Sequence, residues 1–128
     1  MKKNFTDLIK KNKLAHAYLF FGFDRDILIQ FSQWLAEELE PNGKILLDFL
    51  AIESKKETIG IDQVKIIKNF LWQKPIQSSK RTVVIKDAEC LTVEAQNAIL
   101  KVVEEPPARA LIILLVRDRD LLLPTVVS

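Results

Sequence analysis

Residues 82–116 read TVVIKDAECLTVEAQNAILKVVEEPPARALIILLV and carry the clearest structural pattern in the chain. Two apolar runs of strand length, Thr82–Ile85 and Leu111–Val116, flank a segment with the apolar spacing of a helix. Thr92 is placed to cap that helix, and Pro106-Pro107 to stop it after about Glu104. Strands that are apolar throughout, joined by an amphipathic helix, are typical of a parallel sheet covered on both faces.

The same alternation of strand and helix extends toward the N-terminus. Strands are expected at Ala17–Phe21 and Ile45–Ile52. A long helix with one apolar face is expected after Asp24, and Asp62 is expected to open a second one. A short helix over Phe5–Lys11 precedes them. We therefore expect a single domain over residues 1–128, an α/β fold with helices on both faces of a parallel sheet and right-handed crossovers.

Composition excludes several classes of protein. The chain has 128 residues, 48% of them apolar, which is enough for one core, and it has no apolar run long enough for a membrane span. The N-terminus lacks the apolar region of a signal peptide, and a single cysteine, Cys90, excludes an internal disulfide and a cysteine-based zinc site. A cytoplasmic protein is expected. The net charge of +2 makes no strong electrostatic case for nucleic acid.

Four segments, in this order, carry a resemblance to a known family: KLAHAYLFFG (13–22), IDQV (61–64), AQNAILKVVEEPP (95–107) and LLPTVVS (122–128). Together they resemble the delta-prime and gamma/tau clamp-loader subunits of bacterial DNA polymerase III, a branch of the AAA+ ATPases. The resemblance implies a three-layer P-loop-NTPase-like sheet. The last segment resembles the approach to the family's Ser-Arg-Cys motif, so the chain is expected to be truncated before that motif is complete.

The phosphate loop of the family is altered in this chain. An active member would open such a loop at Gly22, with further glycines, a lysine and a hydroxyl residue to hold phosphates and magnesium. Leu28 and Ile29 stand about where the lysine and the hydroxyl residue are expected. Asp24 and Asp26 would repel a triphosphate.

The metal-binding position is altered as well. Lys86 follows the strand at Thr82–Ile85, where the resemblance places a magnesium-binding acid, and a protonated lysine cannot ligate a cation. Asp87 stands where active members carry the acid that orients water, and a one-residue change of register would let it serve as the metal ligand. Arg117 stands about where a small polar residue senses the outer phosphate. We expect no catalytic residue, no cofactor, no metal and no ATP hydrolysis by this chain.

The resemblance then implies a non-catalytic clamp-loader subunit of the delta-prime kind. Such a subunit assists ATP-dependent loading of the sliding clamp onto primed DNA, with delta-type and gamma/tau-type subunits as partners and DNA contacted only within the assembly. One alternative is an active AAA+ ATPase, similar to gamma/tau, with an atypical nucleotide site; another is a truncated domain without function. The interface candidates are Asn97, Lys101, Glu104, Glu105, Pro106 and Pro107.

Other conspicuous residues have structural interpretations. We expect Trp34 and Trp72 to pack within the protein rather than stack on bases, and His16 to be structural. The strand at Ala17–Phe21 is expected to be an uncovered sheet edge, because the family's fifth strand would follow residue 128; this predicts marginal stability or self-association. A loose basic set is expected to be a solvated face, with contact to DNA phosphates as the alternative: Lys65, Lys68, Lys74, Lys80 and Arg81.

Overall fold

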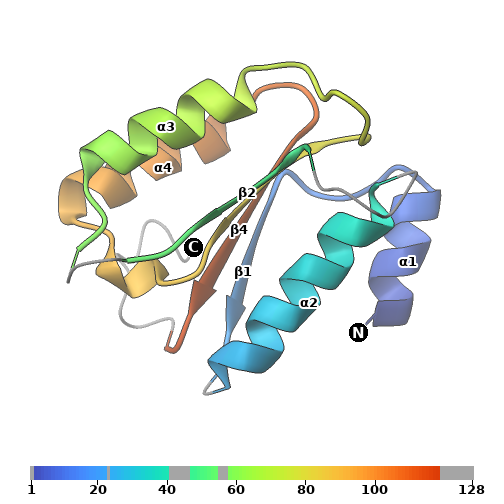
Figure 1. Ribbon diagram of the computed structural model, residues 1–128, viewed down its shortest axis with the longest axis horizontal. Coiled ribbons are helices and arrows are strands. Elements are labelled where there is room, and N and C mark those ends of the chain that lie inside the picture. Colours follow the sequence, from blue (N-terminus) through green and yellow to red (C-terminus); the bar gives the residue numbers. More distant parts are fainter. Residues whose placement is uncertain (1, 23, 41–46, 55–57, 119–128) are drawn as a thin grey trace.

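The computed structural model describes residues 2–22, 24–40, 47–54 and 58–118. Its strands form one parallel sheet in the order β1-β4-β3-β2 (Figure 1). The three-layer α/β architecture is therefore confirmed. The elements are α1 (Lys2–Lys10), β1 (Ala17–Phe21), α2 (Arg25–Glu38), β2 (Phe49–Ile52), α3 (Ile61–Leu71), β3 (Arg81–Ile85), a short 3-10 turn (Ala88–Cys90), α4 (Val93–Glu104) and β4 (Ala110–Val116).

The central strands β3 and β4 are buried along their whole length, as their unbroken apolar sequence predicts. Ile112 of β4 pairs with Ala17 of β1 on one side and with Val83 of β3 on the other. Figure 1 shows α3 and α4 together on one face of the sheet and α1 and α2 on the other. This arrangement gives the protein two cores that share the sheet.

Successive side chains of β4 enter opposite cores. Ile112 and Leu114 pack with α3 and α4, whereas Ile113 and Leu115 pack with α1 and α2. The alternation follows from the two-residue period of a strand. A single strand therefore ties both layers of helices to the sheet.

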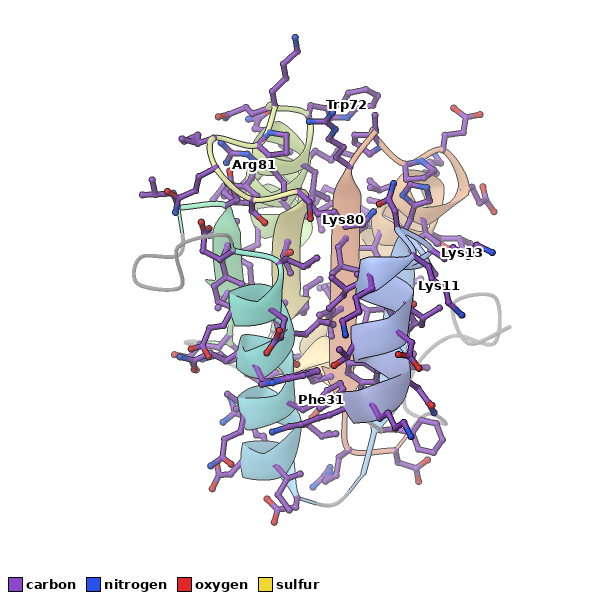
Figure 2. All side chains as sticks on the ribbon, turned by 90° about the vertical axis from the view of Figure 1, so that its right-hand side faces the viewer. Lys11, Lys13, Phe31, Trp72, Lys80 and Arg81 are labelled. Carbon is purple, nitrogen blue, oxygen red and sulfur yellow. The ribbon has the colours of Figure 1, made fainter. Side chains whose placement is uncertain are left out.

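An aromatic cluster fastens α1 to the sheet. Phe5 makes edge-to-face contacts with Tyr18, Phe20 and Phe31 at ring-centroid distances of 5.0, 5.9 and 5.3 Å. Figure 2 shows Phe31 between α2 and α1. The ring centroid of Trp34 lies 5.5 Å from that of Phe31, and the Trp34 side chain is half-buried, so its predicted packing role is confirmed.

The predicted helix caps are largely confirmed. The Asp24 carboxylate accepts the Ile27 N–H at 3.2 Å, and the Thr92 hydroxyl accepts the Ala95 N–H at 3.1 Å. Helix α3 begins one residue earlier than predicted, after Gly60, with Asp62 in its first turn. The Gly60 N–H donates to Gln63 Oε1 at 3.0 Å, and this bond fixes the helix start.

Three expectations are corrected. Strand β2 begins at Phe49, because Asp48 turns inward to bind the backbone of residues 76–78. Trp72 is 67% exposed, because it is the C-cap of α3 and lies beyond the last buried residue of that helix, Leu71. Arg81 is buried: its guanidinium pairs with Asp48 at 3.5 Å and stacks over Phe70, so it is not part of a solvated face.

Within the described residues, β1 and β2 are the outer strands, and Phe21 at the end of β1 is 55% exposed. Among the described helices, none has the length and apolar character needed to cross a bilayer. The first two residues of the strand predicted over Ile45–Ile52 and the motif approach predicted at 122–128 lie outside the described residues.

Candidate functional site

The carboxyl ends of parallel strands are the usual ligand-binding edge of an open α/β sheet. At this edge the protein has a hollow of ≈170 Å³ between the ends of β1, β3 and β4 and the start of α2. Gly22, where an active member would open its phosphate loop, borders it together with three altered positions, Leu28, Lys86 and Arg117. The full lining is Gly22, Arg25, Leu28, Lys86, Glu89, Leu115, Val116 and Arg117.

The turn from β1 into α2 is fixed by the chain's own groups. Gly22 donates its N–H to Val116 O at 3.2 Å and has open space where a Cβ would stand. The first turn of α2 is capped by the Asp24 carboxylate, which occupies one of the free N–H groups that an anion would use. Leu28, rather than a cation, projects into the hollow, while Ile29 packs into the core beneath α2.

Arg25 is held by two carboxylates. Its Nε donates to Asp87 Oδ1 at 3.1 Å and its Nη2 to Asp87 Oδ2 at 3.3 Å, while Glu53 Oε2 lies 3.6 Å from Nη2. The hydrogen bond to Asp87 is the largest effect on the pKa of Arg25 and raises it. Burial opposes this effect, and the negative charge of Asp87 adds to it. The only side-chain cation at the start of α2 is thus directed toward protein carboxylates.

Asp87 has a second partner that defines its position. Its Oδ2 also accepts the Ser54 N–H at 3.1 Å, so both oxygens already take part in hydrogen bonds. Lys86 continues the ladder, donating its N–H to Ile52 O at 2.8 Å, and its half-buried side chain borders the hollow. In this arrangement Asp87 joins the ends of β2 and β3 to the start of α2.

The charges around the hollow cancel. Three cations border it, Arg25, Lys86 and Arg117, and they are matched by Glu89 in the lining and by the two carboxylates on Arg25. Glu89 Oε2 is buried and has no hydrogen-bond partner in the described part of the chain. A phosphate in the hollow would therefore meet cations whose charge is already balanced by carboxylates of the protein. Among the described residues, no group of three or more His, Cys, Asp and Glu is arranged to hold a metal.

The interface candidates lie away from this hollow. Asn97, Lys101 and Glu104 are exposed and follow the spacing of one helix face, so they form a stripe on the outside of α4. Glu105 is exposed just beyond it. Pro106 is half-buried and Pro107 is buried, so only part of the predicted set is open to a partner.

Glu53 and the pairing of Arg25 with Asp87 were not predicted from the sequence. Glu53 follows β2 directly, as Lys86 and Asp87 follow β3. Because adjacent parallel strands end at the same edge, this common position was the available signal. His16 has the structural role expected of it: its Nδ1 lies 3.3 Å from Ala110 O, and its own carbonyl accepts the Ile112 N–H at 2.8 Å.

The fold and the turn at Gly22 define the class: a P-loop-NTPase-like α/β domain. Residues 42–128 match the model of the family described as "DNA polymerase III, delta subunit". This match covers more than half of the chain, and the chain therefore belongs to that family.

Individual relatives agree with this assignment. The chain is 38% identical over 79 residues to DNA polymerase III subunit delta' of Escherichia coli K12, covering 62% of this chain and 24% of that protein. It is 29% identical over 90 residues to DNA polymerase III subunit gamma/tau of Mycobacterium tuberculosis H37Rv, covering 70% of this chain and 15% of the relative. The chain thus matches less than a quarter of either relative's length.

A solved structure extends the likeness to nearly the whole chain. A DNA polymerase III, gamma subunit-related protein of Thermotoga maritima superposes with a TM-score of 0.78 at 33% sequence identity. The match covers 98% of this chain and 42% of that one. The names of all three relatives refer to DNA polymerase III.

Proposed function

We propose that this chain is the AAA+-like domain of a delta-prime-type clamp-loader subunit, a non-catalytic part of the DNA polymerase III holoenzyme. In this role it assists ATP-dependent loading of the sliding clamp onto primed DNA, while partner subunits hydrolyse the ATP. Family membership and the named relatives support a role in replication. The observation that carries the non-catalytic assignment is the pair formed by Arg25 and Asp87.

This pair uses the groups on which a nucleotide site would depend. A phosphate site needs free N–H groups and an available cation, and a metal site needs a free acid. Here Asp24 caps the helix, and Arg25 and Asp87 engage each other. The hollow of ≈170 Å³ is also smaller than the ~300–1,000 Å³ of ordinary ligand pockets. Size, charge and hydrogen bonding all favour a domain that does not bind nucleotide.

The proposed partners are other loader subunits of the gamma/tau and delta types. The outer stripe of α4, with Asn97, Lys101 and Glu104, supports this proposal because its side chains are exposed on a helix that the core holds firmly. Ala95, Ile99 and Val102 anchor the opposite face of α4. A rigid, polar helix face is suited to a subunit contact that must form and break.

Calorimetric titration with ATP and magnesium up to millimolar concentration tests the nucleotide prediction. We expect no saturable heat, while a gamma/tau-type subunit with a complete phosphate loop, measured as a control, gives a clear isotherm. Saturation at micromolar ATP would refute the non-catalytic assignment and favour the alternative of an active AAA+ ATPase with an atypical site.

Affinity capture of purified gamma/tau-type and delta-type subunits by this chain tests the partner prediction. We expect Lys101→Glu on the α4 stripe to weaken capture. Lys65→Glu, the same change at an exposed lysine on neighbouring α3, serves as the matched control and should leave capture unchanged. Equal loss in both variants would remove the stripe as the contact.

A further inference from the structure

A second hollow lies at the opposite end of the sheet, beside the amino end of β4. Its volume is ≈400 Å³, and it lies where the C-terminal ends of α3 and α4 pass into loops. The lining contains two cations and no carboxylate: Trp72, Gln73, Lys74, Pro75, Pro107, Ala108 and Arg109. Since it is remote from Gly22 and Lys86, it is independent of the first hollow.

Trp72 is the dominant side chain of this surface. It is 67% exposed, although a tryptophan buries more apolar area than any other residue when it can pack. Lys74 and Arg109, which border the same hollow, are also exposed. An open indole with cations beside it is the combination that holds bases by stacking and phosphates by charge.

The walls of the hollow are held in place. On one side, the Asp48 carboxylate accepts the backbone N–H groups of Ile76, Gln77 and Ser78 at 2.7, 2.8 and 2.7 Å. On the other, Arg109 adopts φ 63°, and its carbonyl accepts the Arg81 N–H at 2.8 Å. A left-handed arginine is uncommon, and here it is fixed by pairing with β3. The surface is therefore pre-organised.

We propose that this hollow binds single-stranded nucleic acid, with a base stacked on the Trp72 indole and the flanking phosphates near Lys74 and Arg109. The charge of the lining complements a polyanion. The apolar part of the lining is the Trp72 indole with two prolines and an alanine, and it has no Leu, Ile, Val, Met or Phe side chain, so the indole is the large apolar surface on which a base can stack. These two features favour nucleic acid over a protein segment.

Three further lysines lie outside the hollow, on the face of the molecule seen in Figure 2. Figure 2 shows Lys80, Lys13 and Lys11 on the side of the molecule where α1 ends, with Trp72 at the top of the same view. Burial lowers the pKa of Lys80, and its half-buried side chain is less accessible to a phosphate than the exposed Lys11 and Lys13. Two exposed carboxylates at the end of α4, Glu104 and Glu105, precede Pro107 in sequence but are not part of the lining.

Titration of the chain with a short oligo(dT), followed by tryptophan fluorescence, tests the proposal. We expect saturable quenching with a Kd on the order of 10⁻⁴ M at physiological salt, and tighter binding at low salt. Anisotropy of a labelled oligo(dT) then compares variants. Trp72→Ala should weaken binding about five-fold or more, because one stacked base is lost. Trp72→Phe should retain part of the affinity.

Variants that remove a charge distinguish binding at the hollow from nonspecific electrostatic attraction to the protein surface. Lys74→Gln and Arg109→Asn should each lower the salt dependence by about one phosphate contact. Asparagine tolerates the left-handed backbone at position 109. Lys65→Gln, on the outer face of α3, is the matched control and should leave both affinity and salt dependence unchanged. Thermal melting of each variant by circular dichroism verifies folding.

Three outcomes would overturn the proposal: no saturable quenching at low salt, equal losses for Lys74→Gln and Lys65→Gln, or unchanged oligo(dT) binding by Trp72→Ala. If Trp72→Ala instead abolished capture of a loader subunit while oligo(dT) binding persisted, the hollow would belong to a protein partner. Because the oligonucleotide experiment contains neither ATP nor other subunits, its result is independent of the clamp-loader proposal.

Discussion

Arg25 and Asp87 are separated by 62 residues in sequence, yet the arginine Nε lies 3.1 Å from the carboxylate Oδ1. The contact joins the first turn of α2 to the residue that follows Lys86 at the end of β3. Ser54, after β2, donates to the same carboxylate at 3.1 Å. Three loops at the carboxyl edge of the sheet are thereby tied together through protein groups alone.

A double-mutant cycle with R25Q and D87N measures this contact. The Arg25 side chain is 48% exposed, so we expect R25Q alone to cost less than about 1 kcal/mol of unfolding free energy. D87N should cost more, because it also weakens the bond from Ser54 and its side chain is only 17% exposed. The coupling energy, from urea unfolding, should fall at high salt. Coupling indistinguishable from zero at low salt would show that the pair does not form in solution.

Asp48 is the residue whose charge is expected to matter most for stability. Burial raises the pKa of its carboxyl, but the backbone donors at Gln77, Ile76 and Ser78 and the charge of Arg81 outweigh burial, so the pKa lies below its ordinary value of 3.8. We expect Asp48→Asn to cost about 3 kcal/mol, because the buried Arg81 loses its partner. Asp62→Asn, at an exposed position of α3, should cost less than about 1 kcal/mol.

The sign of the pH dependence follows from the lowered pKa of Asp48. The stabilising contribution is complete above the unfolded-state value near 3.8 and is lost as the pH falls through the lower native value. Urea unfolding from about pH 7 to about pH 3 should therefore show a smaller loss of stability in Asp48→Asn than in the original chain. Parallel curves for the two proteins would contradict this assignment.

The parts of the fold that were predicted depend on local pattern. The apolar runs of β3 and β4 and the caps Asp24 and Thr92 were readable because their signals lie within a few residues. The contacts that were missed join residues distant in sequence. Nothing near Asp48 indicates that it will bind residues 76–78 and thereby shorten β2, and nothing near Arg81 shows that it turns inward.

In the candidate site, too, local sequence features were predicted and contacts between distant residues were not. The sequence shows that Leu28 replaces the lysine of a phosphate loop and that Lys86 replaces a metal-binding acid. Both are visible because the family motifs expect these residue types at defined positions. The pairing of Arg25 with Asp87 and Glu53 is not visible in the sequence, since it requires the ends of β2 and β3 to be adjacent in space. Trp72 was assigned to packing by its place near an apolar helix face, but the helix ends one residue before it.

Replacing single buried side chains of β4 by alanine tests whether the two cores unfold as one cooperative unit. Ile112 and Ile113 are both fully buried, but they enter opposite cores. We expect Ile112→Ala and Ile113→Ala each to cost about 2–5 kcal/mol. Because one sheet serves both cores, each variant should still unfold in a single transition, by circular dichroism and by tryptophan fluorescence alike. Separate transitions in either variant would show that the layers of helices unfold independently.

Cys90 should react slowly with thiol reagents in the native protein. Burial is the largest effect and raises the pKa of its thiol. The hydrogen bond with Ser54 opposes burial, and the smaller effects of the negative charges of Glu89 and Asp87 raise the pKa further. Because the thiolate is the reactive form, we expect the initial rate with a disulfide reagent at neutral pH to be well below that of the urea-unfolded chain. Glu89→Gln removes one negative charge beside the thiol and should raise the native rate. A native rate equal to the unfolded one would show that neither burial nor these carboxylates protects Cys90.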